Sequence, residues 1–189
     1  YFLRRRSEFN ALDLQFELSS DWDESNSTLI GIDHSDEDYL LEYFERVERN
    51  GSGVSSFSPI ERIPIDNTGL YLQWQHQLLP SVNTIIGVRQ DSHSINPTEI
   101  SSKFGIIWTA FDNVTIKLLS GESFQSPTVQ LWYRDAVQAG DIIGNEELRP
   151  QNAKTEELIL NWKINPYTKL DTTLFKTKIT DLVVFKGDF

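Results

Sequence analysis

The chain has 189 residues, no cysteine, and 17 Lys and Arg against 28 Asp and Glu, giving a net charge of −11 at pH 7. This balance argues against a nucleic-acid partner, which needs clustered Lys and Arg, and the missing cysteines exclude disulfides, Cys-based zinc sites and thiol nucleophiles. The length suits one domain or two, and no stretch approaches the ~20 consecutive apolar residues of a membrane-spanning helix.

Alternation of apolar and polar residues predicts that most of the chain is β-strand. Residues 12–18 read LDLQFEL, and residues 70–78 read LYLQWQHQL, with His76 as the exception at an even position. A period of two places one residue set on each face of a strand. We therefore expect about eight strands of roughly 9–13 residues. In chain order they cover residues 12–18, 28–38, 68–78, 82–89, 100–109, 114–118, 157–164 and 169–182.

The links between these strands alternate in length. Short links are expected at 21–27, 79–81, 112–113 and 165–167, and long ones at 39–66 and 121–151. Alternate links of an up-and-down meander lie at the same end, so one end carries tight turns and the other carries larger loops. This arrangement is typical of outer-membrane barrels. Within the first long link, residues 39–49 are open to a short helix or a continued strand.

The tryptophans fit this plan without deciding it. Trp22 is expected in a short turn, Trp108 and Trp162 near strand ends, and Trp132 in a long loop. Aromatic residues at strand ends form interfacial girdles in membrane barrels, but buried Trp is also common in soluble sheets. Arg4–Arg6 is interpreted as a solvated strand end or turn.

No catalytic or metal-binding motif emerges from the chain. The three histidines show no ligand spacing, and the acidic run at 33–38 (DHSDED) is interpreted as a solvated strand end rather than a cation site. Residues 120–123 (SGES) do not form a nucleophile elbow. We therefore predict no enzyme activity, no cofactor and no bound metal.

Four motifs between residues 65 and 185 resemble the β-barrel domain of TonB-dependent outer-membrane receptors, and residues 7–38 fit it loosely. The strand ending at GVRQD (87–91) is similar to the family's GxRxD strand, and NPTE at 96–99 with SGESFQSPT at 120–128 is similar to its NPR and GFRAPS elements. GNEELRPQNAKTEELILNW, at 144–162, and LDTTLFKTKITDLV, at 170–183, are similar to the last two motifs. The chain departs from the pattern at Thr98, Gln125, Ser126 and Gln151.

The resemblance implies an all-β fold, an antiparallel up-and-down transmembrane β-barrel. Residues 1–189 would be about eight strands from the later part of a 22-stranded barrel, folded alone as a curved open sheet. Because the chain begins at Tyr1 and contains no methionine, we expect it to be a piece of a longer protein. The family's N-terminal plug domain and TonB box are expected outside these residues.

The resemblance also implies a function, which is TonB-energised uptake of a scarce ligand such as a ferric siderophore or vitamin B12. The expected location is the outer membrane of a Gram-negative bacterium, and the expected partners are that small molecule, membrane lipid and the TonB complex. Trp132, Tyr133 and Arg134 are the candidate ligand-binding residues, because aromatics and Arg suit an anionic metal chelate. The alternative is a soluble, lectin-like β-sandwich that buries Leu70, Leu72 and Trp74 in its core.

Overall fold

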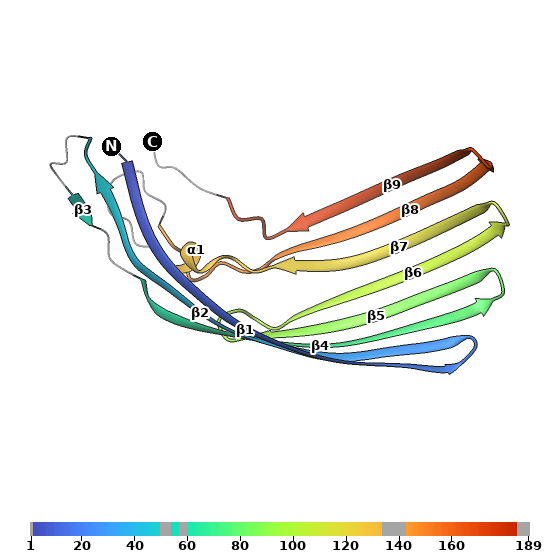
Figure 1. Ribbon diagram of the computed structural model, residues 1–189, viewed down its shortest axis with the longest axis horizontal. Coiled ribbons are helices and arrows are strands. Elements are labelled where there is room, and N and C mark those ends of the chain that lie inside the picture. The colour runs from blue at the N-terminus through green and yellow to red at the C-terminus, as the bar shows by residue number, and fades with distance from the viewer. Residues whose placement is uncertain (1, 50–53, 57–59, 134–142, 185–189) are drawn as a thin grey trace.

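The computed structural model describes residues 2–49, 54–56, 60–133 and 143–184, which fold into one antiparallel sheet with one short helix (Figure 1). The strand order is β1-β2-β4-β5-β6-β7-β8-β9, with the short β3 paired to β2. The elements are β1 (Phe2–Asp23), β2 (Asn26–Val47), β3 (Val54–Ser56), β4 (Ile60–Leu79), β5 (Val82–His93), β6 (Glu99–Phe111), β7 (Val114–Gln125), α1 (Val129–Tyr133), β8 (Gln151–Asn165) and β9 (Thr168–Thr180).

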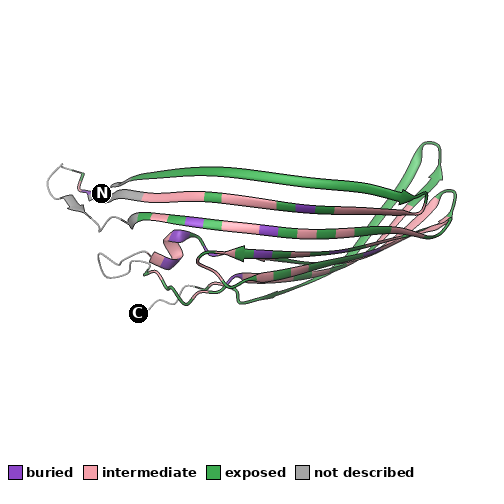
Figure 2. Cartoon of the chain, turned by 90° about the horizontal axis from the view of Figure 1, so that it is seen from below, coloured by how far each residue is buried: buried purple, intermediate pink, exposed green. Residues whose placement is uncertain are grey.

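The sheet is curved and open. It forms a trough with α1 on its concave side (Figure 1). Within the described residues, β1 and β9 each pair on one side only, and both are exposed along their described lengths (Figure 2). The expected fold class, an open curved portion of an up-and-down barrel with about eight long strands, is confirmed.

The two faces of the sheet differ in chemistry because the side chains alternate. Even-numbered residues of the central strands point to the convex face, and they are mainly large and apolar. Large apolar side chains at even positions that remain at least 40% exposed include Leu12, Leu14, Phe16, Leu18, Ile30, Ile32, Leu70, Leu72, Trp74, Leu78, Ile86, Val88, Ile100, Phe104, Trp108, Leu118, Leu158, Trp162, Ile164, Leu170 and Leu174. Odd-numbered residues point to the concave face, and they are mainly polar or glycine.

This distribution differs from that of a soluble sandwich. A sandwich buries the apolar faces of two sheets against each other, whereas the described residues form one sheet with no second layer over its apolar face. The alternative prediction that Leu70, Leu72 and Trp74 lie in a protein core is wrong, because these side chains are 52%, 45% and 40% exposed.

Several strands are longer than the sequence pattern predicts. The expected loop at 39–66 is largely strand, because β2 continues to Val47 and β4 begins at Ile60. Tyr39 pairs with Phe9 on one side and Ile63 on the other, so backbone hydrogen bonding persists where apolar alternation has ended. Residues 39–47 are therefore a continued strand, and Arg4–Arg6 lie near the start of β1.

The tight turns all lie at the end of the sheet away from α1 (Figure 1). Three of the five tryptophans, Trp74, Trp108 and Trp162, are exposed on the convex face toward this end. Trp22 is 70% exposed in β1, just before the turn at residues 24–25, so the prediction that it lies in the turn itself is wrong. Aromatic girdles near strand ends are typical of membrane barrels, so this distribution fits the girdle interpretation.

Candidate functional site

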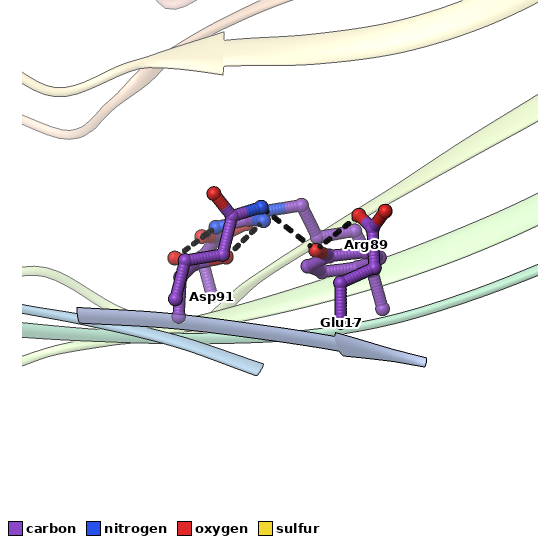
Figure 3. A network of polar contacts seen from close by, with 6 residues as sticks. Glu17, Arg89 and Asp91 are labelled. Atoms are coloured by element: carbon purple, nitrogen blue, oxygen red, sulfur yellow. Dashed lines mark hydrogen bonds and ion pairs between the residues drawn. The ribbon is translucent and has the colours of Figure 1, made fainter. Parts of the chain in front are cut away.

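The strongest polar cluster of the concave face is centred on Arg89 in β5. Its Nη1 and Nη2 donate to the two carboxylate oxygens of Asp33 at 2.6 and 2.8 Å. Its Nε donates to Asp91 Oδ2 at 2.8 Å, and Nη2 donates to Asp91 Oδ1 at 2.6 Å (Figure 3). Paired, charge-assisted contacts of this kind fix geometry as well as charge. Because Asp33 is on β2 and Arg89 is on β5, the arginine ties two strands together across β4.

A second part of the network connects β4 to the edge strand β1. The Tyr71 hydroxyl donates to Glu17 Oε2 at 2.9 Å and accepts from Gln15 Nε2 at 2.9 Å. The Arg89 guanidinium lies 5.5 Å from the centroid of the Tyr71 ring, within the range of a cation–π contact. The six residues of Figure 3 therefore link four neighbouring strands on the concave wall.

Glycines make room for these long side chains. A Cβ on Gly31 would collide with the Tyr71 ring, and a Cβ on Gly69 would meet the Arg89 Cζ at 2.6 Å and Asp33 Oδ1 at 2.7 Å. Gly87 is covered in the same way by Lys103, whose Cε would be 2.6 Å away. A large side chain of one strand thus lies flat over a glycine of the preceding strand, so these glycines are required for close approach rather than for an unusual backbone.

At the other end of the trough, α1 is attached to the sheet and to the segment that precedes β8. Gln130 Nε2 donates to the Tyr39 hydroxyl at 2.7 Å. The GNEELRP segment at 144–150 contributes two contacts, because Asn145 N donates to Leu131 O at 2.8 Å and Leu148 O accepts from Trp132 Nε1 at 3.3 Å. The 144–150 segment therefore positions the short helix.

A cavity of about 560 Å³ lies between α1 and the concave wall. Its lining includes Glu37, His93 and Trp132, and the Trp132 ring meets that of His93 edge-on with centroids 6.4 Å apart. Burial lowers the pKa of His93, with Glu37 opposing that shift. The remaining lining residues are Phe9, Tyr39, Ile65, Asn67, Phe124, Ser126, Pro127, Thr128, Val129 and Gln130. One of them, Asn67, has a buried side-chain oxygen without a hydrogen-bond partner in the structure.

A second cavity of about 710 Å³ lies near the tight turns, between the β1–β2 turn and β5. Its rim is fixed by Asp23, whose carboxylate accepts from the backbone N of Ser25 at 2.7 Å and from the Asn26 side chain at 2.9 Å. These hydrogen bonds, that of Ser25 first, hold the pKa of Asp23 below its usual value. The described residues include no group of three or more His, Asp or Glu side chains arranged to hold a metal ion.

The candidate ligand-binding residues fall into different environments. Trp132 is 4% exposed, held between His93 and the 144–150 segment, so its side chain anchors α1. Tyr133 is partly exposed and lies against Trp132, with ring centroids 6.4 Å apart. Arg134 lies outside the described residues. Whether any of the three contacts a ligand stays a prediction.

The sequence pattern did not predict that the polar residues of the concave face form one network. Arg89 and Asp91 belong to the GVRQD motif, but the motif does not identify their partners Asp33, Tyr71 and Glu17. The available signal was parity, since all five occupy odd positions, whereas the large apolar residues near them, such as Leu18, Ile32, Leu72 and Val88, occupy even ones. The acidic run at 33–38 is likewise divided by parity, because Asp33 pairs with Arg89 while Asp38 pairs with Arg62.

Comparison with known proteins gives a family match over the full chain. The family described as "TonB dependent receptor-like, beta-barrel" matches residues 1–189. A search of curated protein sequences gives no match. No helix in the described residues is long and apolar enough to cross a membrane.

Solved structures share the fold at low sequence identity. The copper transporter OprC has a TM-score of 0.75 at 12% identity over 95% of this chain and 31% of that chain. The siderophore receptor PirA from Pseudomonas aeruginosa has a TM-score of 0.71 at 16% identity, covering 93% and 33%. The FrpB iron transporter from Neisseria meningitidis has a TM-score of 0.68 at 15% identity, covering 93% and 30%. The chain thus spans about a third of the length of these structures.

Proposed function

Because this chain belongs to the β-barrel family of TonB-dependent receptors, we propose that it forms part of an outer-membrane receptor that takes up a scarce ligand. The family comprises transporters rather than enzymes. The proposal is supported by the solved structures of similar fold, which are described as siderophore receptors, an iron transporter and a copper transporter. A ferric siderophore or cobalamin is the proposed ligand class, and a Gram-negative outer membrane is the proposed location.

Residues 1–189 would be one wall of a larger, 22-stranded barrel. This proposal is supported by the two sheet edges, β1 and β9, which would pair with further strands to close the barrel. The plug domain and the TonB box would be contributed by other parts of the same receptor, and the TonB complex would supply the energy. The convex face would contact lipid and the concave face would line the lumen.

The observation that carries the proposal is the difference between the two faces of one sheet. The convex face is a continuous band of exposed apolar side chains, while the concave face carries a satisfied ion network and a cavity beneath α1. The cavity lies at the end opposite the tight turns, where ligand would enter. Tyr133 and Arg134 are the proposed ligand contacts, and Trp132 anchors the helix that ends at Tyr133.

The proposal is tested with the full-length receptor in a Gram-negative strain that lacks its own siderophore and cobalamin receptors. Uptake of ⁵⁵Fe-loaded siderophores and of ⁵⁷Co-cobalamin is measured with and without a functional TonB complex. We expect TonB-dependent uptake of one ligand, reduced by Tyr133→Ala or Arg134→Ala. Absence of uptake for every ligand by a receptor that is present in the outer membrane would contradict the proposed transport function.

A further inference from the structure

The convex face of β8 and β9 changes from apolar to basic at one level of the sheet. Leu158 of β8 pairs with Leu174 of β9, and both side chains are exposed. The next convex pair is Glu156 with Lys176, and the one after it is Lys154 with Lys178. Lys154, Lys176 and Lys178, here called the lysine cluster, are all exposed.

The position of this change matches the thickness of a membrane. Lys176 and Lys178 follow the start of β9 at Thr168 by eight and ten residues. At about 3.4 Å per residue on a strand tilted by about 40°, they lie roughly 20–26 Å from the tight-turn end. The apolar band of such barrels is about 25 Å tall. The lysine cluster therefore lies where the outer hydrocarbon boundary would meet lipid headgroups.

The lysine cluster has fewer carboxylates around it than lysines. Lys154 and Lys178 are directly opposite on neighbouring strands, and like charges in this position repel each other. Glu122 holds Lys154 at 3.3 Å, but within the described residues no carboxylate lies within ion-pair distance of Lys176 or Lys178. Three lysines against Glu122 and Glu156 leave one net positive charge on this surface.

A convex arginine farther from the tight turns has carboxylate partners. Arg62 of β4 is held by Glu8 at 3.3 Å and Asp38 at 3.1 Å, so this cation is already neutralised within the protein. Among the described residues, the remaining lysines of the strands (Lys103, Lys117, Lys163 and Lys169) occupy odd, concave positions. Among the lysines that the structure describes, those on the convex face are thus confined to the outer part of β8 and β9.

We propose that the lysine cluster binds the phosphorylated headgroup of an outer-leaflet glycolipid, whose acyl chains pack on Leu158 and Leu174 below it. An anionic phosphate placed between Lys154 and Lys178 removes their repulsion, and the long lysine side chains reach it from the apolar boundary. This inference rests on the outer-membrane location proposed above, and it adds a lipid site on the outside of the barrel.

The test uses the detergent-solubilised full-length receptor, diphosphorylated lipid A, and the same lipid without phosphates, with adducts quantified by native mass spectrometry. The double variant Lys176→Glu/Lys178→Glu should bind the phosphorylated lipid about 30-fold more weakly than wild type, at about 1 kcal/mol per lysine. The lipid without phosphates should bind both proteins equally. Lys176→Gln/Lys178→Gln replaces the double variant if charge reversal prevents folding.

The matched control is Lys163→Glu/Lys169→Glu, which changes another opposed lysine pair of the same two strands, on the concave face near the turn. It should keep the wild-type affinity. Equal affinity of the cluster variant and wild type, or an equal loss in the control, overturns the lipid site. Fractionation of the receptor with the outer membrane is shown first. A negative binding result then rejects only the lipid site and leaves the proposed transport function standing.

Discussion

At the level of single residues, Arg89 makes the contacts on which the concave wall most depends. It shares its guanidinium between Asp33 and the nearly buried Asp91, whose side chain is 4% exposed. A carboxylate so placed is stable only while its cation is in position, because an unpaired buried charge costs about 3–5 kcal/mol. The planar fork of arginine matches both carboxylates at once, whereas the ammonium of lysine cannot.

The first prediction follows from that geometry. Arg89→Lys should lower the free energy of unfolding of the full-length receptor in detergent by about 1.5–3 kcal/mol, since paired contacts to two charged groups are lost. The measurement is the urea dependence of the folded band in heat-modifiability gels. Arg62→Lys is the control, because the Arg62 ion pairs are about half exposed and should change stability by less than about 1 kcal/mol. Equal effects of the two variants would refute the role given to Arg89.

The glycines under the network provide a second prediction. Gly69→Ala places a Cβ against the Arg89 guanidinium, which cannot move aside without leaving Asp33 and Asp91. It should destabilise the receptor by about 1–3 kcal/mol, as overpacking does. Gly121→Ala meets nothing within 4 Å and should be neutral or slightly stabilising in the same assay. A neutral Gly69→Ala would show that the network tolerates displacement.

At the level of elements, α1 is held by tertiary contacts rather than by its own propensity. Five residues are too few to form a stable helix alone. Its stability comes from the buried Trp132 and Val129, the Gln130–Tyr39 hydrogen bond and the 144–150 segment.

Trp132 is therefore expected to control whether α1 stays docked. Trp132→Phe removes the hydrogen bond to Leu148 O and should weaken docking by roughly 1 kcal/mol, while Trp132→Ala should weaken it by about 3 kcal/mol or more. Amide hydrogen exchange at residues 129–133 measures the change, and exchange in the middle of β4 and β5 should stay slow. If exchange at 129–133 is unchanged in Trp132→Ala, Trp132 does not anchor the helix.

Docking of α1 should also depend on pH through His93. Its pKa is lowered in the folded state by burial, so the undocked form binds the proton more tightly. The stabilising effect of neutral His93 is complete above its usual pKa of 6.5 and is lost as the pH falls below it. The protection factors of residues 129–133, which correct the exchange rates for their intrinsic pH dependence, should fall from pH 7 to pH 5 in wild type but not in His93→Gln. A pH response retained by His93→Gln would assign the effect to another group.

The elements also differ in how far the sequence predicts them. Strands such as β4 and β6 follow from alternation because one face of each is apolar over its central part. Beyond the apolar band the pattern ends, so the outer parts of β2 and β4 were taken for a loop although their backbones remain paired. The α1 helix was not predicted, because no local signal fixes five residues that depend on distant partners. The Arg89 network needed the strand register, which brings Asp33 and Arg89 together over 56 residues of sequence.

At the level of the whole molecule, the described residues leave the apolar convex face of the sheet uncovered by protein. The apolar residues there are exposed in a continuous band, and the girdle tryptophans mark its boundary at the turn end. The lysine cluster would mark the boundary at the other end on β8 and β9. Both features follow if lipid covers the convex face and water fills the concave one.

The most direct test of this account is the accessibility of spin labels along β4 in the full-length receptor reconstituted in lipid. Single cysteines at positions 70–75 are labelled, any other cysteines of the receptor having been replaced, and collision with oxygen or with a water-soluble nickel complex is measured. Labels at Leu70, Leu72 and Trp74 should collide with oxygen, and labels at Tyr71, Gln73 and Gln75 with nickel. Equal nickel access at even and odd positions would contradict the assignment of the two faces to lipid and lumen.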